Sequence, residues 1–234
     1  MNVPIRHDVY FRHHRFYAWA CVVAFASVFV GFARTYYLKF LFGTPALPWL
    51  LHLHGALMTS WFVLFFAQTC LVAGRRVDLH RRLGVFGAVL TFMIVGLGVV
   101  VSVRAAMGAV STPPTHPAEF LALLGYNLVS IVVFAGFVAA ALILRRRSDY
   151  HKRLMLLAAL SILGQPLARV VSDFTAVLLV YSFVLVYVAI DTARHHRLHP
   201  AFAWGAPLLI VALHLAFLGY QTTTWIEFAR RLVS

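Results

Sequence analysis

Seven apolar segments, each close to the length of a membrane-spanning helix, constrain the fold of this chain more than any other feature. We place them near residues 16–33, 47–73, 84–105, 119–144, 153–171, 174–192 and 203–220. About 20 residues of helix cross the ~30 Å hydrocarbon core of a bilayer. Backbone polar groups inside lipid must be satisfied within the chain, which favours helices. The sequence therefore predicts an all-α fold, a single seven-transmembrane-helix bundle that occupies residues 1–234.

The composition fits a membrane protein better than a soluble one. Of 234 residues, 62% are hydrophobic and 12% are charged, whereas soluble domains carry about 25% charged residues. The formal net charge of +13 is a possible sign of nucleic-acid binding, but the basic residues form short clusters between the apolar segments. That distribution is a topology signal of membrane proteins. We therefore expect the lipid bilayer, and no nucleic acid, as the partner of these charges.

Most Lys and Arg residues fall on the same side of the predicted membrane as the N-terminus. The basic residues on the opposite side are Arg34, Lys39, Arg104, Arg169, Arg230 and Arg231. Cytoplasmic loops hold the excess of Lys and Arg. The sequence thus predicts a multi-pass protein of the bacterial inner membrane with its N-terminus in the cytoplasm.

Two details qualify the helical pattern. Gln165-Pro166 lies inside the fifth segment, where proline is expected to kink the helix. The fifth and sixth segments are joined by a very short connection. Fusing them into one helix breaks the charge rule for the loops that follow, so we keep seven segments.

Cys21 and Cys70 lie in apolar runs and are expected to be buried, inert thiols.

One phrase occurs twice, as VDLHRRLG at 77–84 and SDYHKRLM at 148–155. Asp78 in the first copy corresponds to Asp149 in the second. The same number of positions separates the arginine and the leucine that follow in one copy from their counterparts in the other. Helix capping by aspartate and the positive charge of cytoplasmic loops predict much of this phrase. They do not predict a histidine at the same place in both copies.

His80 and His151 are the two histidines of this phrase. We interpret the repetition as a pseudo-repeat in which the second and third helices correspond to the fourth and fifth. Such symmetry would bring both imidazoles to equal depth on facing helices, where they could ligate one haem iron or share a metal ion. The alternative is that both are interfacial residues near lipid phosphates.

A second set of polar residues lies deeper in the predicted helices. His54 shares a helical face with Met58, Trp61, Phe65 and Gln68. The residues expected at about 10–12 Å from the outer ends of their helices are His54, Asn127, Gln165 and His214. His54 and His214 are candidates to ligate a second haem, and together with Gln165 and Arg169 to bind a quinone headgroup. The alternative is that each side chain only bonds a neighbouring helix.

The motifs HLHGALMTSW, VDLHRRLG and YHKRLMLLA, with Gln68, together resemble a group of bacterial polytopic membrane proteins without an assigned activity. More loosely, histidines at the ends of membrane hairpins resemble cytochrome b561 and haem A synthase. That resemblance implies haem binding. The fourth segment has no histidine between Glu119 and Arg147, so the resemblance carries over to the inner pair His80 and His151 rather than to a complete two-haem arrangement.

No metalloprotease, P-loop or nucleophile-elbow signature occurs in the chain. We expect an integral membrane redox protein that binds b-type haem, quinone or both, and exchanges electrons with a membrane redox partner. The alternative is a non-catalytic transport or complex-assembly protein in which the polar layer lines a path or supports a partner. The sequence does not decide between an enzyme and a non-enzyme.

Overall fold

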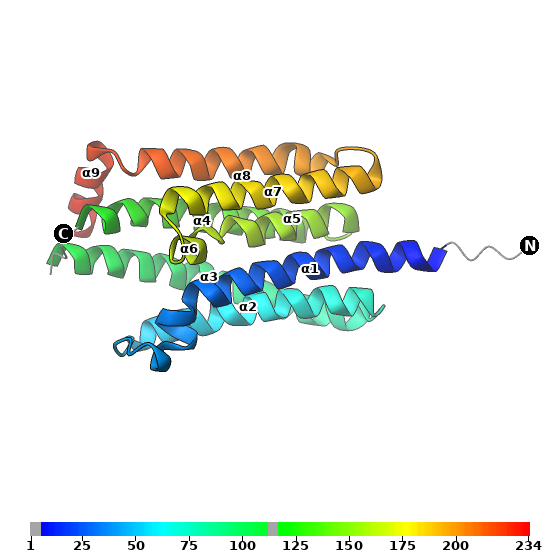
Figure 1. Ribbon diagram of the computed structural model, residues 1–234, viewed down its shortest axis with the longest axis horizontal. Helices are drawn as coiled ribbons and strands as arrows, with labels where there is room; N and C mark the ends of the chain where they lie inside the picture. Colours follow the sequence, from blue (N-terminus) through cyan, green and yellow to red (C-terminus); the bar gives the residue numbers. More distant parts are fainter. Residues whose placement is uncertain (1–5, 112–116) are drawn as a thin grey trace, which may run out of the picture. The chain divides into compact units, whose positions relative to one another are not determined.

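The computed structural model describes residues 6–111 and 117–234, and these residues form helices and no strand (Figure 1). Six helices are long and apolar enough to cross a membrane. Their candidate spans are Phe16–Tyr37, Trp49–Ala73, Val77–Ser111, Ala118–Ile143, Asp173–His195 and Pro200–Gly219. The chain is therefore an all-helical, multi-pass membrane protein.

The chain forms two compact units, Met1–Ile94 and Val95–Ser234, and the division falls inside α3. The elements before it are α1 (Arg6–Phe32), the π-helical turn η1 (Ala33–Tyr37), the 3-10 turn η2 (Lys39–Leu41), α2 (Trp49–Ala73) and α3 (Val77–Ser111). The elements after it are α4 (Pro117–Ile143), α5 (Ser148–Ser161), α6 (Gly164–Ala168), α7 (Asp173–His195), α8 (Pro200–Gly219) and α9 (Thr223–Val233).

In the first unit, α1 packs on α2. The α2 face that carries His54 and Gln68 is buried or half-buried along its length, as the sequence predicts. On that face the Trp61 indole donates a hydrogen bond of 3.2 Å to the Thr91 hydroxyl of α3 and stacks on Phe65. Indole N–H groups are costly to bury without a partner, and this bond fixes α2 against the first half of α3.

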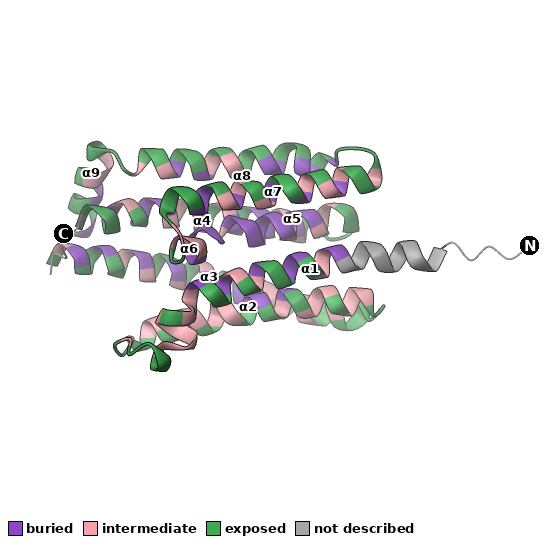
Figure 2. Cartoon of the chain, in the orientation of Figure 1, coloured by how far each residue is buried: buried purple, intermediate pink, exposed green. Residues whose placement is uncertain are grey.

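In the second unit, α5 is the most enclosed helix, and it packs against α4, α7 and α8 (Figure 2). From Leu154 onwards its residues are small or aliphatic on nearly every side, and the fully enclosed ones are Leu154, Leu156, Leu157, Ala158, Ala159 and Leu160. A helical segment that is apolar all round belongs in a core. Gly205 of α8 allows this packing, because a Cβ at that position would lie 2.6 Å from Leu157 Cδ1.

The predicted fifth segment is the main departure from the sequence-based fold. It divides into α5 of 14 residues and α6 of five, and neither is long enough to cross a bilayer alone. Pro166 provides the physical reason, since its ring clashes with the carbonyl four residues earlier, at Ile162. The helix ends at Ser161, so the predicted kink is a complete break.

Three smaller expectations are corrected. Asp78 and Asp149 do not cap their helices, because α3 begins at Val77 and α5 at Ser148, which makes each aspartate the second helical residue. In that position a carboxylate still interacts favourably with the helix dipole. Cys70 is exposed rather than buried, while Cys21 is buried as expected. The amphipathic α9 was not predicted at all.

Candidate functional site

A buried ion pair joins α5 to α7 at the end of the second unit where α5 and α8 begin. Arg153 Nε donates to Asp191 Oδ2 at 2.8 Å, and Arg153 Nη2 donates to Asp191 Oδ1 at 2.9 Å. Both side chains are only 1% exposed. This is the two-bond geometry for which guanidinium and carboxylate groups are matched.

The remaining surfaces of the Arg153 guanidinium are also occupied. Its Nη1 donates to the carbonyl oxygen of Asp149 at 2.8 Å. Its Cζ lies 6.0 Å from the centre of the buried Phe202 ring of α8, within range of a cation–π interaction. Arg153 therefore connects α5 to α7 and α8 with its charge compensated.

His195, one turn after Asp191, adds a titratable ring to this cluster. Its Nδ1 lies 2.8 Å from the carbonyl oxygen of Asp191. A carbonyl only accepts, so the proton is on Nδ1. The 3.5 Å approach of Arg153 Nη2 to the same nitrogen is then a contact between two donors rather than a hydrogen bond. In this tautomer Nε2 is the nitrogen with the lone pair.

His199 closes the other side of the cluster and begins α8. Its Nδ1 accepts a hydrogen bond of 3.1 Å from the backbone N–H of Ala201, so the ring caps the helix and its neutral form carries the proton on Nε2. The Tyr150 ring of α5 packs edge-on against His199, with centroids 4.7 Å apart. The ring is therefore fixed from two helices.

Together these side chains line a small cavity of about 30 Å³. Its lining residues are Asp149, Arg153, His195, Arg197 and His199. A water molecule needs roughly 10–15 Å³ of such space, so the cavity suits one or two waters or a single oxyanion group. Asp149 is the one carboxylate of the lining, and the Lys152 ammonium, 3.1 Å away, lowers the pKa of Asp149.

This geometry predicts a pH-dependent stability with a defined origin. Burial and the nearby Arg153 lower the pKa of His199 from its ordinary value, which is about 6.5 in the unfolded chain. The folded state thus favours neutral His199, so its stabilising contribution is complete above about pH 6.5 and is lost as the pH falls through the lowered folded pKa. Thermal unfolding in detergent across this range measures the loss.

Asparagine is the matched control for His199, because it caps helices well and does not titrate. The His199→Asn variant should keep most of the stability at neutral pH and lose less of it on acidification than the parent chain. An unchanged acid slope in this variant would assign the pH dependence to other groups.

His151 lies on another face of α5, directed at α4. Its Nδ1 donates to the carbonyl oxygen of Ala141 at 2.9 Å, across the turn between the two helices, and the ring is half-buried. His80 is half-buried as well, and it is the fourth residue of α3 just as His151 is the fourth residue of α5. The repeated phrase therefore begins a helix at the same residue in both copies. His80 belongs to the first unit and His151 to the second.

The predicted polar layer is divided between the units. His54 lies in the first unit with its buried Nδ1 lacking a hydrogen-bond partner among the described residues. In the second unit Asn127 and Gln165 are half-buried, on α4 and α6. Arg169 directly follows α6 and has an exposed side chain. His214 is exposed on α8, with its ring centre 6.2 Å from that of Tyr181.

Two tyrosines that the sequence analysis did not single out lie near these residues. The hydroxyl groups of Tyr126 on α4 and Tyr181 on α7 are buried, and neither has a hydrogen-bond partner among the described residues. The Tyr126 hydroxyl lies directly against Gly164, where a Cβ would collide with it. Buried donors without partners are uncommon in native proteins, so these two are candidates to bind a water or a ligand.

The ion pair was not predicted from the sequence. Arg153 lies in a basic cluster of the kind that indicates membrane topology, and Asp191 was not among the candidate residues. The available signal was that Asp191 is an ionisable residue inside a predicted membrane segment, which is a reason to expect a functional or paired group. Among the described residues, no group of three or more His, Cys, Asp or Glu side chains is arranged to hold a metal ion.

No family model, no curated protein and no solved structure matches the chain.

Proposed function

We propose that this chain is an integral membrane redox protein that binds b-type haem, with His151 of the second unit and His80 of the first unit each as a candidate haem ligand. The observation that carries the proposal is the hydrogen bond from His151 Nδ1 to the carbonyl of Ala141. Metal-ligating histidines donate their second ring N–H to a carbonyl or carboxylate, which fixes the tautomer and orients Nε2 towards the metal. An iron held by a porphyrin needs only one or two protein ligands.

Two contacts of the second unit would then hold the His151 imidazole in position to bind haem. Ala141 orients the imidazole, and the Arg153–Asp191 pair fixes the first turn of α5, from which His151 projects. Haem supplies one-electron transfer when it is bound. In the second unit, the polar groups proposed for a quinone headgroup are His214, Gln165 and Arg169, and the buried hydroxyls of Tyr126 and Tyr181 are further donors suited to quinone carbonyls. His54 is a separate candidate in the first unit.

The proposed topology keeps seven crossings, with α5 and α6 together forming an interrupted fifth. Interrupted helices are tolerated at membrane depth where the protein satisfies their backbone. The N-terminus and the Arg153 end of the second unit then face the cytoplasm of a bacterium, according to the distribution of Lys and Arg. A quinol and a second membrane protein are the proposed redox partners, in keeping with the resemblance to haem-binding hairpin proteins.

The visible spectrum of the purified protein, expressed with ample haem supply, tests the proposal. We expect a Soret band that is lost in His151→Ala and strongly reduced in His80→Ala. His52→Ala is the control, because His52 is an exposed histidine of α2 and its loss should leave the band unchanged. A colourless parent protein, or a band that survives both the His151→Ala and the His80→Ala substitutions, would reject the assignment.

A second candidate function is favoured by the charged cavity. Its buried guanidinium and two imidazoles suit a non-catalytic transport or complex-assembly protein that passes or holds a small polar solute. The same spectrum separates the two functions, since this candidate requires no absorbing cofactor.

A further inference from the structure

The C-terminal helix α9 leaves the bundle and turns across its end. It follows α8 after a three-residue link and is capped by Thr222, whose side chain accepts a hydrogen bond from Trp225 N. Figure 1 shows α9 running across the end of α8 instead of continuing it. The helix is strongly amphipathic, with one apolar and one polar face.

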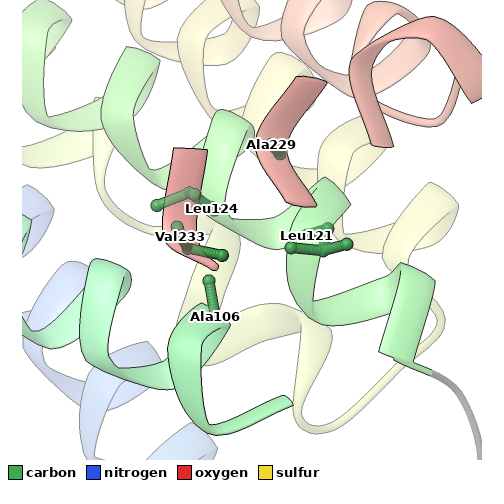
Figure 3. Packing of buried hydrophobic residues seen from close by; sticks show 5 residues of the cluster. All are labelled: Ala106, Leu121, Leu124, Ala229 and Val233. Atoms are coloured by element: carbon green, nitrogen blue, oxygen red, sulfur yellow. The ribbon is translucent and has the colours of Figure 1, made fainter. Parts of the chain in front are cut away.

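Its inner face is fixed to α4 and to the second half of α3. Ala229 and Val233, one turn apart, pack in a cluster with Ala106, Leu121 and Leu124 (Figure 3). The Trp225 indole donates a 2.8 Å hydrogen bond to the carbonyl oxygen of Leu121. The position of α9 is therefore set by a specific contact and not by its link alone.

The contact also sets the depth of α9 in the membrane. Leu121 is the fourth residue of the span that begins at Ala118, about 5 Å along the helix axis. The span of α8 ends at Gly219, and Tyr220 packs edge-on against Trp225 with ring centroids 4.3 Å apart. Both observations place α9 at the level where hydrocarbon meets headgroups, the depth that Trp and Tyr prefer.

The outer side of α9 carries both apolar and cationic side chains. Phe228 and Leu232 share a face at i,i+4 spacing, and they are 56% and 61% exposed. Arg230 and Arg231 lie in the last turn and are exposed as well. Apolar side chains beside cations at this depth match the acyl chains and phosphates of a lipid surface.

We propose that α9 is an interfacial lipid-binding helix, in which Phe228 and Leu232 enter the acyl boundary while Arg230 and Arg231 bind the phosphates of anionic phospholipids. This role is independent of any cofactor. It gives the protein a preference for anionic lipid at the end of the second unit opposite to Arg153, where the overall charge distribution provides few other cations.

Probe labelling at single cysteines tests the depth of the outer face. In a Cys21→Ala/Cys70→Ser background, a fluorescent probe is attached to Phe228→Cys or, as the matched control, to Glu227→Cys, and the full-length chain is placed in nanodiscs. Lipids that carry a quencher near the headgroup end of the acyl chain should quench the probe at 228 and not at 227. Equal quenching at both positions, or protection of 228 from both lipid and aqueous quenchers, would overturn the proposal, and the second result would indicate a protein partner instead.

The charge preference is tested separately with Arg230→Gln/Arg231→Gln. Each arginine near an anionic surface contributes about fivefold to binding, so the double variant should lose about 25-fold in its preference for phosphatidylglycerol over phosphatidylcholine. Competition among lipids retained after purification measures this preference. Arg146→Gln, an exposed residue at the other end of α4, is the control and should change the preference much less. An unchanged preference in the double variant would show that the two arginines do not bind lipid phosphates.

Discussion

Replacing Asp191 with leucine is expected to destabilise the protein by about 3–5 kcal/mol, because the substitution leaves the Arg153 guanidinium buried without its carboxylate. Arg153→Met should cost a similar amount, since it removes the guanidinium partner of the buried Asp191 carboxylate. Taking both charges away should recover most of the loss. Buried ion pairs replaced by apolar residues of similar size are often neutral or stabilising.

Thermal unfolding of the detergent-solubilised variants measures these differences. Arg82→Met is the matched control, because Arg82 holds the equivalent place in the first copy of the repeated phrase and is exposed; its loss should change the stability by less than about 0.5 kcal/mol. If Asp191→Leu and Arg82→Met have equal effects, the pair does not hold α5 against α7.

Gly164→Ala is expected to cost about 1–3 kcal/mol, because the added methyl group would collide with the hydroxyl of Tyr126. Tyr126→Phe removes the colliding oxygen, so the double variant should recover a large part of the loss. Tyr126→Phe alone should have little effect on stability, since that hydroxyl has no hydrogen-bond partner among the described residues.

The same unfolding assay includes a glycine with space around it. A Cβ at Gly136, which lies in the same helix as Tyr126, would meet no atom within 4 Å, so Gly136→Ala should be neutral or stabilising by up to about 1 kcal/mol. Failure of Tyr126→Phe to rescue Gly164→Ala would place the steric conflict elsewhere. A large loss in Tyr126→Phe alone would show instead that the hydroxyl binds a water or a ligand.

The sequence was sufficient for the membrane spans, since six of the seven predicted segments correspond to apolar helices of spanning length. Length and hydropathy determine such helices almost independently of tertiary structure. The fifth segment shows the limit of that argument. Pro166 predicts that the helix is distorted, but whether the helix bends or ends there depends on the packing around it.

Less of the candidate site could be predicted from the sequence. The phrase SDYHKRLM drew attention to His151 and not to Arg153, because clustered basic residues at a helix start are usually solvated topology signals. Which of these side chains turns into the core depends on the angular position of α5 and on a carboxylate 38 residues away. A single sequence contains neither piece of information in its local pattern.

The short helix α9 was missed for another reason. Its 11 residues contain two arginines and a glutamate, so they do not register as a membrane segment. Its role depends on a hydrogen bond between residues 104 positions apart, and periodicity within a window cannot predict that contact.

The interruption after Ser161 has a consequence for biogenesis. A segment as short as α5, with Arg153 near its start, is a poor substrate for the translocon, because arginine is costly to insert and apolar length is lacking. Its carboxylate partner is made 38 residues later, roughly 2–8 seconds at ordinary rates of synthesis. During that interval α5 has no compensated place in the lipid phase. We therefore expect the nascent chain to retain α5 beside the exit channel until α7 emerges, so that α5 and α7 integrate together rather than one helix at a time.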